Sequence, residues 1–441
     1  MIDLPRDVAF LIQELESAGF EAWTVGGCVR DSLLGLSPHD WDVCTNARPE
    51  QTLCVFSGRR VIETGIRHGT VTVMLNHTSY EVTTYRTEGI YTDSRRPDSV
   101  SFVAGLKEDL SRRDFTVNAM AYHPQRGLYD VFGGAEDIKS KIIRCVGDPD
   151  ARFQEDALRI MRALRFSATY GFAIEEKTAQ ALHGLKDRLL LIAPERIREE
   201  LMRLIAGAYA ADVLREHAPV LYVVLPELAP MHSHAQHSPY HLDIWEHTLQ
   251  AMAAMPPEPV LRLAMLLHDA GKPACFFKDE KGTGHFCGHP QESLRLAGEI
   301  MARLRFDNQT RQTVGELVLY HDAVIPAKEK NVLRWLSRIG EARLRQLIAV
   351  MRADALAQHP DKREAKLLDI AALKACLDIA VQKGLPYKLK DLAITGNDLI
   401  ATGISPGPQV GRILHSLLEQ VMDGDLANEK KSLLKRALLE P

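Results

Sequence analysis

The chain has 441 residues, of which 46% are hydrophobic and 25% charged, with a formal net charge of −4 at pH 7. This length predicts two to four domains, and the charge gives no global sign of nucleic-acid binding, so any RNA surface has to be a local basic patch. The seven cysteines are scattered and odd in number, which favours reduced thiols over a disulfide framework or a zinc ribbon. The sequence has no apolar run of 18 residues, and we expect a soluble cytoplasmic protein.

Residues 5–18 have the apolar spacing of an amphipathic helix, and the stretch 24–42 follows. In that stretch a β-prone run ends at Gly26 and Gly27, a short helix is predicted, and a second β-prone piece carries Asp40 and Asp42. Two carboxylates two residues apart on a strand share a face and predict a magnesium site, while the glycines allow close approach of a phosphate. Taken singly, each motif also fits an ordinary turn or a solvated strand edge.

The order and spacing of these residues resemble the opening motif of the polymerase-beta-type nucleotidyltransferases. More narrowly, they resemble the bacterial transfer-RNA nucleotidyltransferases that build the CCA end. The matching residues are Gly26, Gly27, Arg30, Asp31, Leu34, Gly35, Asp40 and Asp42. The resemblance implies a catalytic head with Mg²⁺ held by Asp40 and Asp42, and with Gly26, Gly27 and Arg30 at the nucleotide.

Short β-like runs at 60–62, 69–74 and 80–85 continue the head, and a polar stretch at 86–110 reads as one long loop. Glu81 lies on the last of these runs, where an edge-strand glutamate is the structural alternative. The resemblance makes Glu81 the third catalytic carboxylate. It also makes the 86–110 loop a flexible element that helps the site change from adding C to adding A.

The string 112–121 resembles the second motif of the family. An ordinary helix start with solvated arginines is the alternative, but the resemblance places Arg112 and Arg113 on the triphosphate. In the same string, Asn118 would hydrogen-bond the ribose and so favour ribonucleotides.

Residues 149–168 predict one continuous helix with acidic and basic residues at helical spacing. On pattern alone, an exposed helix with ion pairs of about 0.2–0.5 kcal/mol each is the alternative. The family's base-selecting motif maps onto Glu155, Asp156 and Arg159, with Arg162 on the adjoining stripe. Asp156 and Arg159 would match the donor and acceptor that cytosine and adenine share, and Glu155 would orient Arg159.

A second group of metal-ligand residues follows in the helical part of the chain. It surrounds the string His268-Asp269-Ala270-Gly271-Lys272 and resembles the HD phosphohydrolase superfamily. The ligand order maps onto His247, His268, Asp269, His289, His321 and Asp354. This implies a transition metal such as Mn²⁺, Ni²⁺ or Fe²⁺, in either a hydrolase or a retained metal scaffold for RNA.

We therefore expect an α+β protein with a mixed or antiparallel sheet in the head, followed by an all-α neck, HD body and tail. The predicted boundaries are 1–145 for the nucleotidyltransferase head, 146–210 for the neck, 211–365 for the body and 366–441 for an RNA-binding tail. The expected activity is CCA addition to transfer RNA from CTP and ATP. The alternatives are an A-adding or poly(A)-adding enzyme, an HD phosphodiesterase or phosphatase, and an inactive RNA-binding scaffold. The sequence leaves the oligomeric state open.

Overall fold

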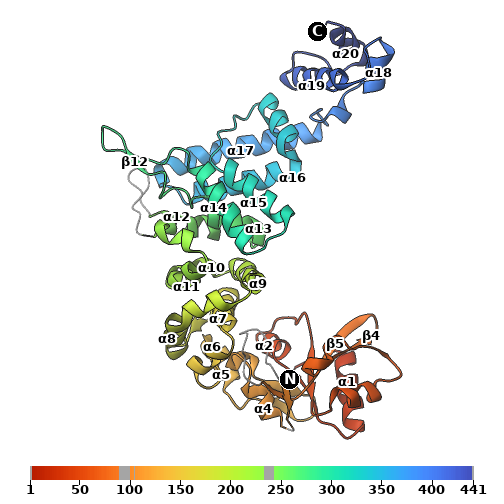
Figure 1. The fold of residues 1–441 in the computed structure, drawn as a ribbon, viewed down its shortest axis with the longest axis vertical. Coiled ribbons are helices and arrows are strands. Elements are labelled where there is room, and N and C mark those ends of the chain that lie inside the picture. Colours follow the sequence, from red (N-terminus) through yellow and green to blue (C-terminus); the bar gives the residue numbers. More distant parts are fainter. Residues whose placement is uncertain (1, 89–99, 104, 233–242, 440–441) are drawn as a thin grey trace. The chain divides into compact units, whose positions relative to one another are not determined.

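The computed structural model describes residues 2–88, 100–103, 105–232 and 243–439. By their contacts these residues form two compact units, unit 1 (Met1–Pro226) and unit 2 (Glu227–Pro441). In Figure 1 the colour of the ribbon follows the sequence, so unit 1 begins in red and unit 2 ends in blue. The main sheet lies in unit 1, while unit 2 is almost entirely helical, which confirms the predicted α+β class. The finer division into four parts remains a prediction.

The main sheet of unit 1 has seven strands in the order β3-β4-β5-β2-β1-β8-β9. Neighbouring strands are antiparallel except β2 and β5, which run parallel, so the sheet is mixed as predicted. The strands are β1 Ala22–Val25, β2 Asp42–Thr45, β3 Arg60–Ile62, β4 Thr70–Leu75, β5 Thr78–Thr84, β8 Ala121–His123 and β9 Gly127–Tyr129.

Two apolar cores cover the two faces of this sheet. On one face, helix α1 (Arg6–Ser17) packs against a core that contains Val43 and Val82. Cys44 belongs to the core on the opposite face. Because strand side chains alternate, Asp42 shares the face of Cys44 and Glu81 lies opposite Val82. Both carboxylates therefore emerge on the same face of the sheet.

Helices surround the sheet and extend beyond it in unit 1. They are α1 Arg6–Ser17, α2 Gly27–Leu33, α3 Pro49–Val55, α4 Leu106–Ser111, α5 Gly134–Ser140, α6 Pro149–Glu155, α7 Leu158–Tyr170, α8 Glu176–Leu185, α9 Pro194–Ile205, α10 Ala210–Glu216 and α11 Ala218–Val224. Short 3-10 turns occur at Ile66–His68, Thr116–Asn118 and Lys186–Leu191, and a two-stranded ladder joins β10 Ile142–Ile143 to β11 Ala173–Ile174.

The prediction of one continuous helix over 149–168 is wrong. Helix α6 ends at Glu155, the backbone at Asp156 is extended (φ −140°, ψ 102°), and α7 begins at Leu158. The Asp156 carboxylate accepts a hydrogen bond from the backbone N–H of Leu158 at 3.0 Å. Such a local bond from a side chain to the backbone competes with the helical pattern and explains the break.

The prediction of one long loop over 86–110 is wrong at both ends. Residues Arg86–Glu88 and Val100–Phe102 form an antiparallel ladder, β6 and β7, and Leu106–Ser111 forms α4. Residues 89–99 and 104, on which the predicted flexible element largely depends, lie outside the described residues.

Unit 2 is built from helices joined by short connections. They are α12 Ile244–Ala253, α13 Pro259–Leu267, α14 His289–Arg303, α15 Asn308–Tyr320, α16 Glu329–Leu356, α17 Pro360–Gln382, α18 Gly396–Ala401, α19 Pro408–Asp423 and α20 Lys430–Ala437, with a hairpin of β12 Phe277–Lys278 and β13 Gly284–His285. Two 3-10 turns, Pro226–Met231 at the boundary between the units and Leu389–Asp391, complete the elements. No helix in the described ranges is both long enough and apolar enough to cross a bilayer.

Candidate functional site

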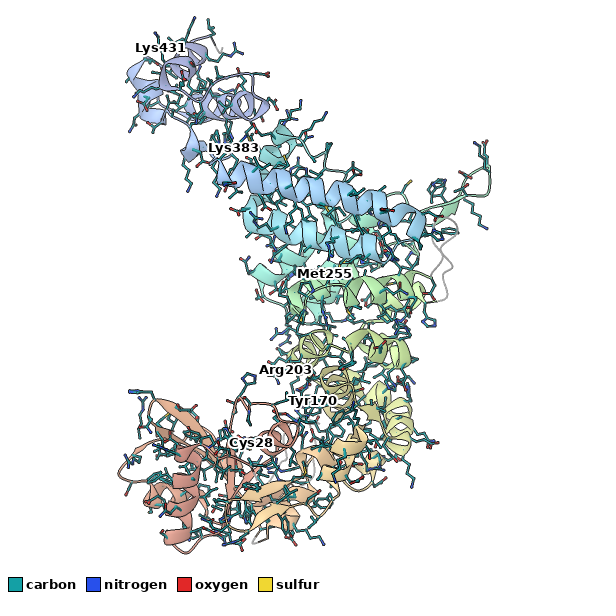
Figure 2. All side chains as sticks on the ribbon, turned by 180° about the vertical axis from the view of Figure 1, so that it is seen from behind. Cys28, Tyr170, Arg203, Met255, Lys383 and Lys431 are labelled. Carbon is teal, nitrogen blue, oxygen red and sulfur yellow. The ribbon has the colours of Figure 1, made fainter. Side chains whose placement is uncertain are left out.

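A cleft of about 740 Å³ in unit 1 brings most of the predicted head residues together. Its lining includes nine arginines and five aspartates, an excess of fixed positive charge that suits a triphosphate. Figure 2 labels one residue on each of three helices that surround it: Cys28 on α2, Tyr170 at the end of α7 and Arg203 on α9. The predicted residues that line the cleft are Gly26, Gly27, Arg30, Asp40, Asp42, Arg112, Arg113, Asn118, Asp156, Arg159 and Arg162. Glu81 and Glu155 lie outside the lining.

The predicted catalytic carboxylates lie at the start of β2 and on the neighbouring strand β5. Asp42 is the first residue of β2, whereas Asp40 precedes the strand and is exposed. Glu81 is the direct cross-strand partner of Asp42 in the parallel pair β2–β5. Burial raises the pKa of the Asp42 carboxyl to about 6; Arg113 opposes this rise, and Glu81 and Asp40 add to it. Negative charge is therefore crowded here, which is the condition that a bound cation relieves.

Gly26 allows the guanidinium of Arg113 to lie against the turn before α2. Its backbone has φ 82°, and a Cβ at this position would lie 2.8 Å from Arg113 Nη1. A larger residue would therefore be strained and would also displace the guanidinium. Gly26 thus lets Arg113 lie close to the backbone at the start of α2.

A buried polar network links the nucleotide-binding candidates. Arg30 donates to the Asn118 amide oxygen, and Asn118 donates to Asp114 at 3.1 Å. Asp114 in turn accepts from Arg162 Nε at 2.7 Å. Arg30 also stacks on Tyr170, with 4.8 Å from its guanidinium carbon to the ring centroid. These contacts fix Asn118, the predicted ribose partner, before any ligand binds.

Asp114→Asn is expected to lower the free energy of unfolding at pH 7 by roughly 2 kcal/mol. Burial would raise the pKa of Asp114, but the charge of Arg162 and the hydrogen bonds from Asn118 and Arg162 outweigh it and hold this pKa at about 2. Since the folded-state pKa lies below the unfolded value, the ionised carboxylate stabilises the fold at neutral pH, and this contribution disappears as the pH falls from about 4 towards 2.

Urea unfolding of the two proteins across this pH range measures the difference. Asp150→Asn, a change at an exposed aspartate on α6, is the control and should leave the free energy of unfolding unchanged. A gap between wild type and Asp114→Asn that stays constant down to pH 2 would contradict the assignment.

Different contacts hold the two predicted base-selecting residues, Arg159 and Asp156, in place. Arg159 donates to Glu155 at 2.7 Å and to the backbone carbonyls of Arg152 and Arg112 at 3.1 and 3.0 Å. Its guanidinium is therefore held by three acceptors, and Glu155 orients it although Glu155 does not line the cleft. Asp156 sits in the break between α6 and α7, where Arg196 of α9 donates to it at 2.8 Å.

Several cleft residues were not predicted from the sequence. The cleft is also lined by three further arginines, Arg86, Arg165 and Arg203, and by Asp114 and Arg196. The helical spacing of Arg162 and Arg165 on α7 was an available signal, because residues three apart share a helix face. Glu200 of α9 binds Arg165 Nε at 2.7 Å, a contact between two helices that local pattern does not show.

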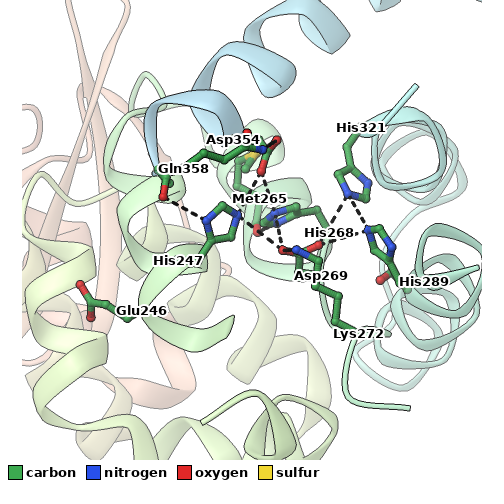
Figure 3. Close-up of polar contacts among 12 residues, drawn as sticks. Glu246, His247, Met265, His268, Asp269, Lys272, His289, His321, Asp354 and Gln358 are labelled. Atoms are coloured by element: carbon green, nitrogen blue, oxygen red, sulfur yellow. Dashed lines mark hydrogen bonds and ion pairs between the residues drawn. The ribbon is translucent and has the colours of Figure 1, made fainter. Parts of the chain in front are cut away.

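The six histidines and aspartates of the second group lie together in unit 2, as Figure 3 shows. They come from five helices or the residues next to them, and all are buried. Two overlapping sets, His247–His268–Asp354 and His268–Asp269–His321, each bring three ligand atoms within 4.8 Å of one another. His289 Nε2 lies 3.4 Å from Asp269 Oδ1, which adds the sixth residue.

The ring nitrogens of the four histidines are already oriented. In each ring Nδ1 lies against a backbone carbonyl oxygen. The pairs are His247 with Ala357 at 3.3 Å, His268 with Met265 at 2.6 Å, His289 with Phe286 at 2.9 Å and His321 with Val318 at 2.7 Å. A carbonyl only accepts, so Nδ1 carries the proton and each Nε2 of a neutral ring presents its lone pair to the cluster. The Nε2 atoms of His289 and His321 are 3.2 Å apart, an arrangement that needs a cation or a proton between them.

The carboxylates of this cluster are held in the ionised form that binds metal. Burial would raise the pKa of Asp269, but His268 and Lys272 outweigh it and keep that pKa well below its usual range. Among the described residues, neither Asp269 oxygen nor His268 Nε2 makes a well-formed hydrogen bond, although these atoms approach to 3.1 Å. Imidazole and carboxylate groups converging in this way fit a transition-metal ion.

Comparison with known proteins covers nearly the whole chain. Residues 22–144 match the Poly A polymerase head domain, 171–231 the "Probable RNA and SrmB- binding site of polymerase A", and 291–437 the tRNA nucleotidyltransferase domain 2. The CCA-adding enzyme of Limosilactobacillus fermentum is 36% identical over 97% of this chain and 95% of its own length, and that of Leuconostoc mesenteroides is 34% identical over 98% and 95%.

A solved structure shares the fold as well. The Bacillus stearothermophilus CCA-adding enzyme, crystallised in complex with CTP, is 30% identical in sequence and has a TM-score of 0.72. The match covers 98% of this chain and 96% of the chain of that enzyme. Identity above 30% over almost the full length of both proteins, together with this fold, establishes the relationship. The chain belongs to the CCA-adding enzyme family of nucleotidyltransferases.

Proposed function

We propose that the chain adds the CCA sequence to the 3′ end of transfer RNA from CTP and ATP, without a template and with release of pyrophosphate. Family membership supports this activity and does not favour poly(A) addition, A-only addition or an RNA-binding scaffold. The observation that carries it is the cleft of unit 1. There the carboxylates Asp40 and Asp42 and the pair Asp156 and Arg159 line one cavity rich in arginine.

Nucleotidyl transfer in this family depends on metal, and we infer that Asp40 and Asp42 hold Mg²⁺. The residues fit this ion, because hard carboxylate oxygens suit magnesium, and because Glu81 and Asp40 add to the rise that burial causes in the pKa of Asp42. Glu81, directly beside Asp42 on β5, is inferred as the third carboxylate. When bound, magnesium lowers the pKa of the attacking 3′-hydroxyl and offsets the charge of the triphosphate.

The chain's own residues position the nucleotide. Arg112 and Arg113 are inferred to bind the triphosphate, since both line the cleft and Arg113 lies against Gly26. Asn118 is inferred to hydrogen-bond the ribose, and Arg30 and Asp114 hold its amide in place. Positioning of this kind supplies a large part of the rate of phosphoryl transfer.

Base choice is inferred to depend on Asp156 and Arg159. Cytosine and adenine each present an exocyclic amine beside a ring-nitrogen acceptor, so a carboxylate accepts from the first and a guanidinium donates to the second. Uracil and guanine reverse this polarity and would leave buried polar groups unpaired. Arg162 binds Asp114 at 2.7 Å and is inferred to support the sugar-binding side of the same site.

Incubation of the pure protein with transfer RNA lacking CCA and with CTP alone is expected to add two cytidines. ATP supplied afterwards should then complete the CCA end. Gel analysis of the labelled RNA measures both steps. An enzyme that extends the RNA only with ATP, or that adds a long run of A, would contradict CCA addition.

The division of labour along the chain is also a proposal. We infer a catalytic head over 1–145, a neck over 146–210, a body over 211–365 and an RNA-binding tail over 366–441. Recognition of RNA by shape and backbone suits this arrangement, since double-stranded RNA offers few readable base edges.

A second candidate activity rests on the histidine cluster of unit 2. We infer that His247, His268, Asp269, His289, His321 and Asp354 hold a transition metal such as Mn²⁺, Ni²⁺ or Fe²⁺. The preset Nδ1 bonds and the converging Nε2 and carboxylate atoms support this inference. The metal would serve a phosphohydrolase of the HD type.

His268→Ala is expected to remove at least about nine-tenths of the bound metal, because His268 belongs to both ligand sets. Metal content of protein exposed to Mn²⁺ and then desalted, measured by mass spectrometry, checks this. His285→Ala is the matched control, since the partly exposed His285 pairs with Asp279 and belongs to neither ligand set. Unchanged metal content in His268→Ala would exclude the site, and CTP addition by the same variant should continue.

A further inference from the structure

Two of the seven cysteines flank the β12–β13 hairpin of unit 2, Cys275 before it and Cys287 after it. Figure 1 shows this hairpin projecting from the helices of unit 2. Its paired residues are Phe277 with His285 and Lys278 with Gly284. The same register, continued by one residue, brings Phe276 opposite Phe286, and the centroids of these two rings lie 5.4 Å apart. One residue further, it brings Cys275 opposite Cys287.

The two thiols interact, and one of them is open to solvent. Burial raises the pKa of Cys275, and the charges of Glu292 and Cys287 add to this rise, so the two sulfur atoms lie close enough to interact electrostatically. Cys287 is exposed, and Cys275 is only partly buried. A small solute can therefore reach Cys287 while Cys275 lies beside it. An exposed cysteine with a second, resolving cysteine next to it is typical of redox-responsive sites.

Backbone hydrogen bonds hold both ends of the hairpin in position. The N–H of Cys275 donates to the carbonyl of Gly271 at 3.2 Å. Directly before Cys287, the carbonyl of Phe286 accepts from the backbone N–H of His289 at 3.1 Å. The two cysteines are thus presented by ordered segments, and groups held side by side react faster than groups that first have to find each other.

We propose that Cys275 and Cys287 are a redox-responsive pair, which a peroxide converts to a disulfide across the base of the hairpin. With hydrogen peroxide, the sulfur of the exposed Cys287 bonds to one peroxide oxygen, the oxygen–oxygen bond breaks, and the other oxygen leaves as water with the thiol proton. The sulfur of Cys275 then bonds to the sulfur of this sulfenic acid. The sulfur–oxygen bond breaks, and the hydroxyl group leaves as a second water with the thiol proton of Cys275. The two thiols lose two electrons, and the peroxide gains them.

The disulfide would join two segments that carry residues to the histidine cluster. Lys272, three residues before Cys275, lies 2.7 Å from Asp269, and His289 follows Cys287 by two residues. Neither cysteine belongs to the proposed metal ligands, so the disulfide forms whether or not a metal is bound. Oxidation would therefore tie the chain that leaves α13 to the chain that enters α14.

The test treats the full-length reduced protein with hydrogen peroxide, blocks the remaining thiols with iodoacetamide and maps the tryptic peptides by mass spectrometry without reduction. Peptides 263–278 and 282–295, which carry one cysteine each, are expected to be linked, and dithiothreitol should separate them. The link should form at least about tenfold faster in folded protein than in protein unfolded in urea, because only the fold holds the cysteines opposite each other. The absence of the linked peptide, or equal rates in the two states, would overturn the proposal.

A second pair of neighbouring cysteines makes the peptide map a test of position. Burial is the main cause of the raised pKa of Cys44, and Cys28 of the same unit also contributes to it. Both of these thiols are buried, and Cys28 Sγ donates to the carbonyl of Val25 at 3.4 Å. Their peptides should therefore stay unlinked. A link between Cys28 and Cys44 in place of the one in the hairpin would overturn the proposal.

Cys275→Ser tests the order of the two steps. Without the resolving thiol, the sulfenic acid of Cys287 should persist, and dimedone should label it at least about tenfold more than in wild type. Cys54→Ser, which removes an exposed cysteine of α3, is the matched control. It should form the linked peptide, and its Cys287 should be labelled as little as in wild type. Equal labelling of Cys287 in wild type and in Cys275→Ser would show that Cys275 takes no part and would overturn the proposal.

Discussion

Replacement of Asp42 by Ala is expected to slow nucleotide addition by at least about a thousandfold, because the variant loses a carboxylate for the metal that stabilises the transition state by several kcal/mol. Asp42 begins β2 at the cleft and has Glu81 directly beside it on the neighbouring strand. Single-turnover extension of transfer RNA lacking its last A measures the chemical step. Asp42→Asn should be equally slow, because it keeps the size of the side chain but not its charge.

Asp150→Ala is the control for this experiment, since it removes an exposed carboxylate of α6 that does not line the cleft. Its rate should equal that of wild type. Addition by Asp42→Ala within tenfold of the wild-type rate would show that the metal is held by other residues and that the head site has been wrongly assigned.

Arg159→Ala is expected to reduce the preference for CTP over UTP by at least about a hundredfold, because the variant no longer leaves a donor unpaired against uracil. Arg159 is held by Glu155 and by two backbone carbonyls, so its guanidinium is fixed before the base arrives. The ratio of kcat/KM for the two nucleotides is the quantity to compare. Loss of preference with a smaller loss of rate would separate base choice from chemistry.

Arg152→Ala is the matched control for base choice. Arg152 also pairs with Glu155, at 2.6 Å, but it does not line the cleft. Its variant should therefore keep the preference for CTP. A preference that survives in Arg159→Ala, or that falls equally in Arg152→Ala, would sink the assignment of Arg159 to the base.

The sequence was sufficient to predict elements whose pattern is local. Helix α1 and the strands at 60–62, 70–75 and 78–84 follow directly from apolar periodicity and β-propensity. The break at Asp156 could not be predicted in this way, because helix propensity across 149–168 is good throughout. The break depends on the hydrogen bond that the Asp156 carboxylate accepts from the Leu158 N–H, and on the contact of Asp156 with Arg196 from a later helix. A tertiary contact overrides propensity here.

The candidate sites show the same contrast. The string around His268 and the order of the later histidines were enough to predict the histidine cluster of unit 2. Its role as a metal site remains a prediction. Motif positions likewise placed most head residues in one cleft. Arg203 and the bridging Glu200 were beyond prediction because their place depends on how α7 and α9 pack. Arg165 could have been found from its helical spacing to Arg162.

The histidine cluster is assembled largely from helix ends, and this determines which changes evolution can make there. His268 and His321 each follow the last residue of a helix, and His289 is the first residue of the next one. Deleting one residue from such a helix turns everything beyond it by about 100°. Lineages that retain the cluster should therefore vary freely in the identity of exposed residues on α13 to α15, yet keep the lengths of these helices fixed. Lineages that have lost it should show insertions and deletions there.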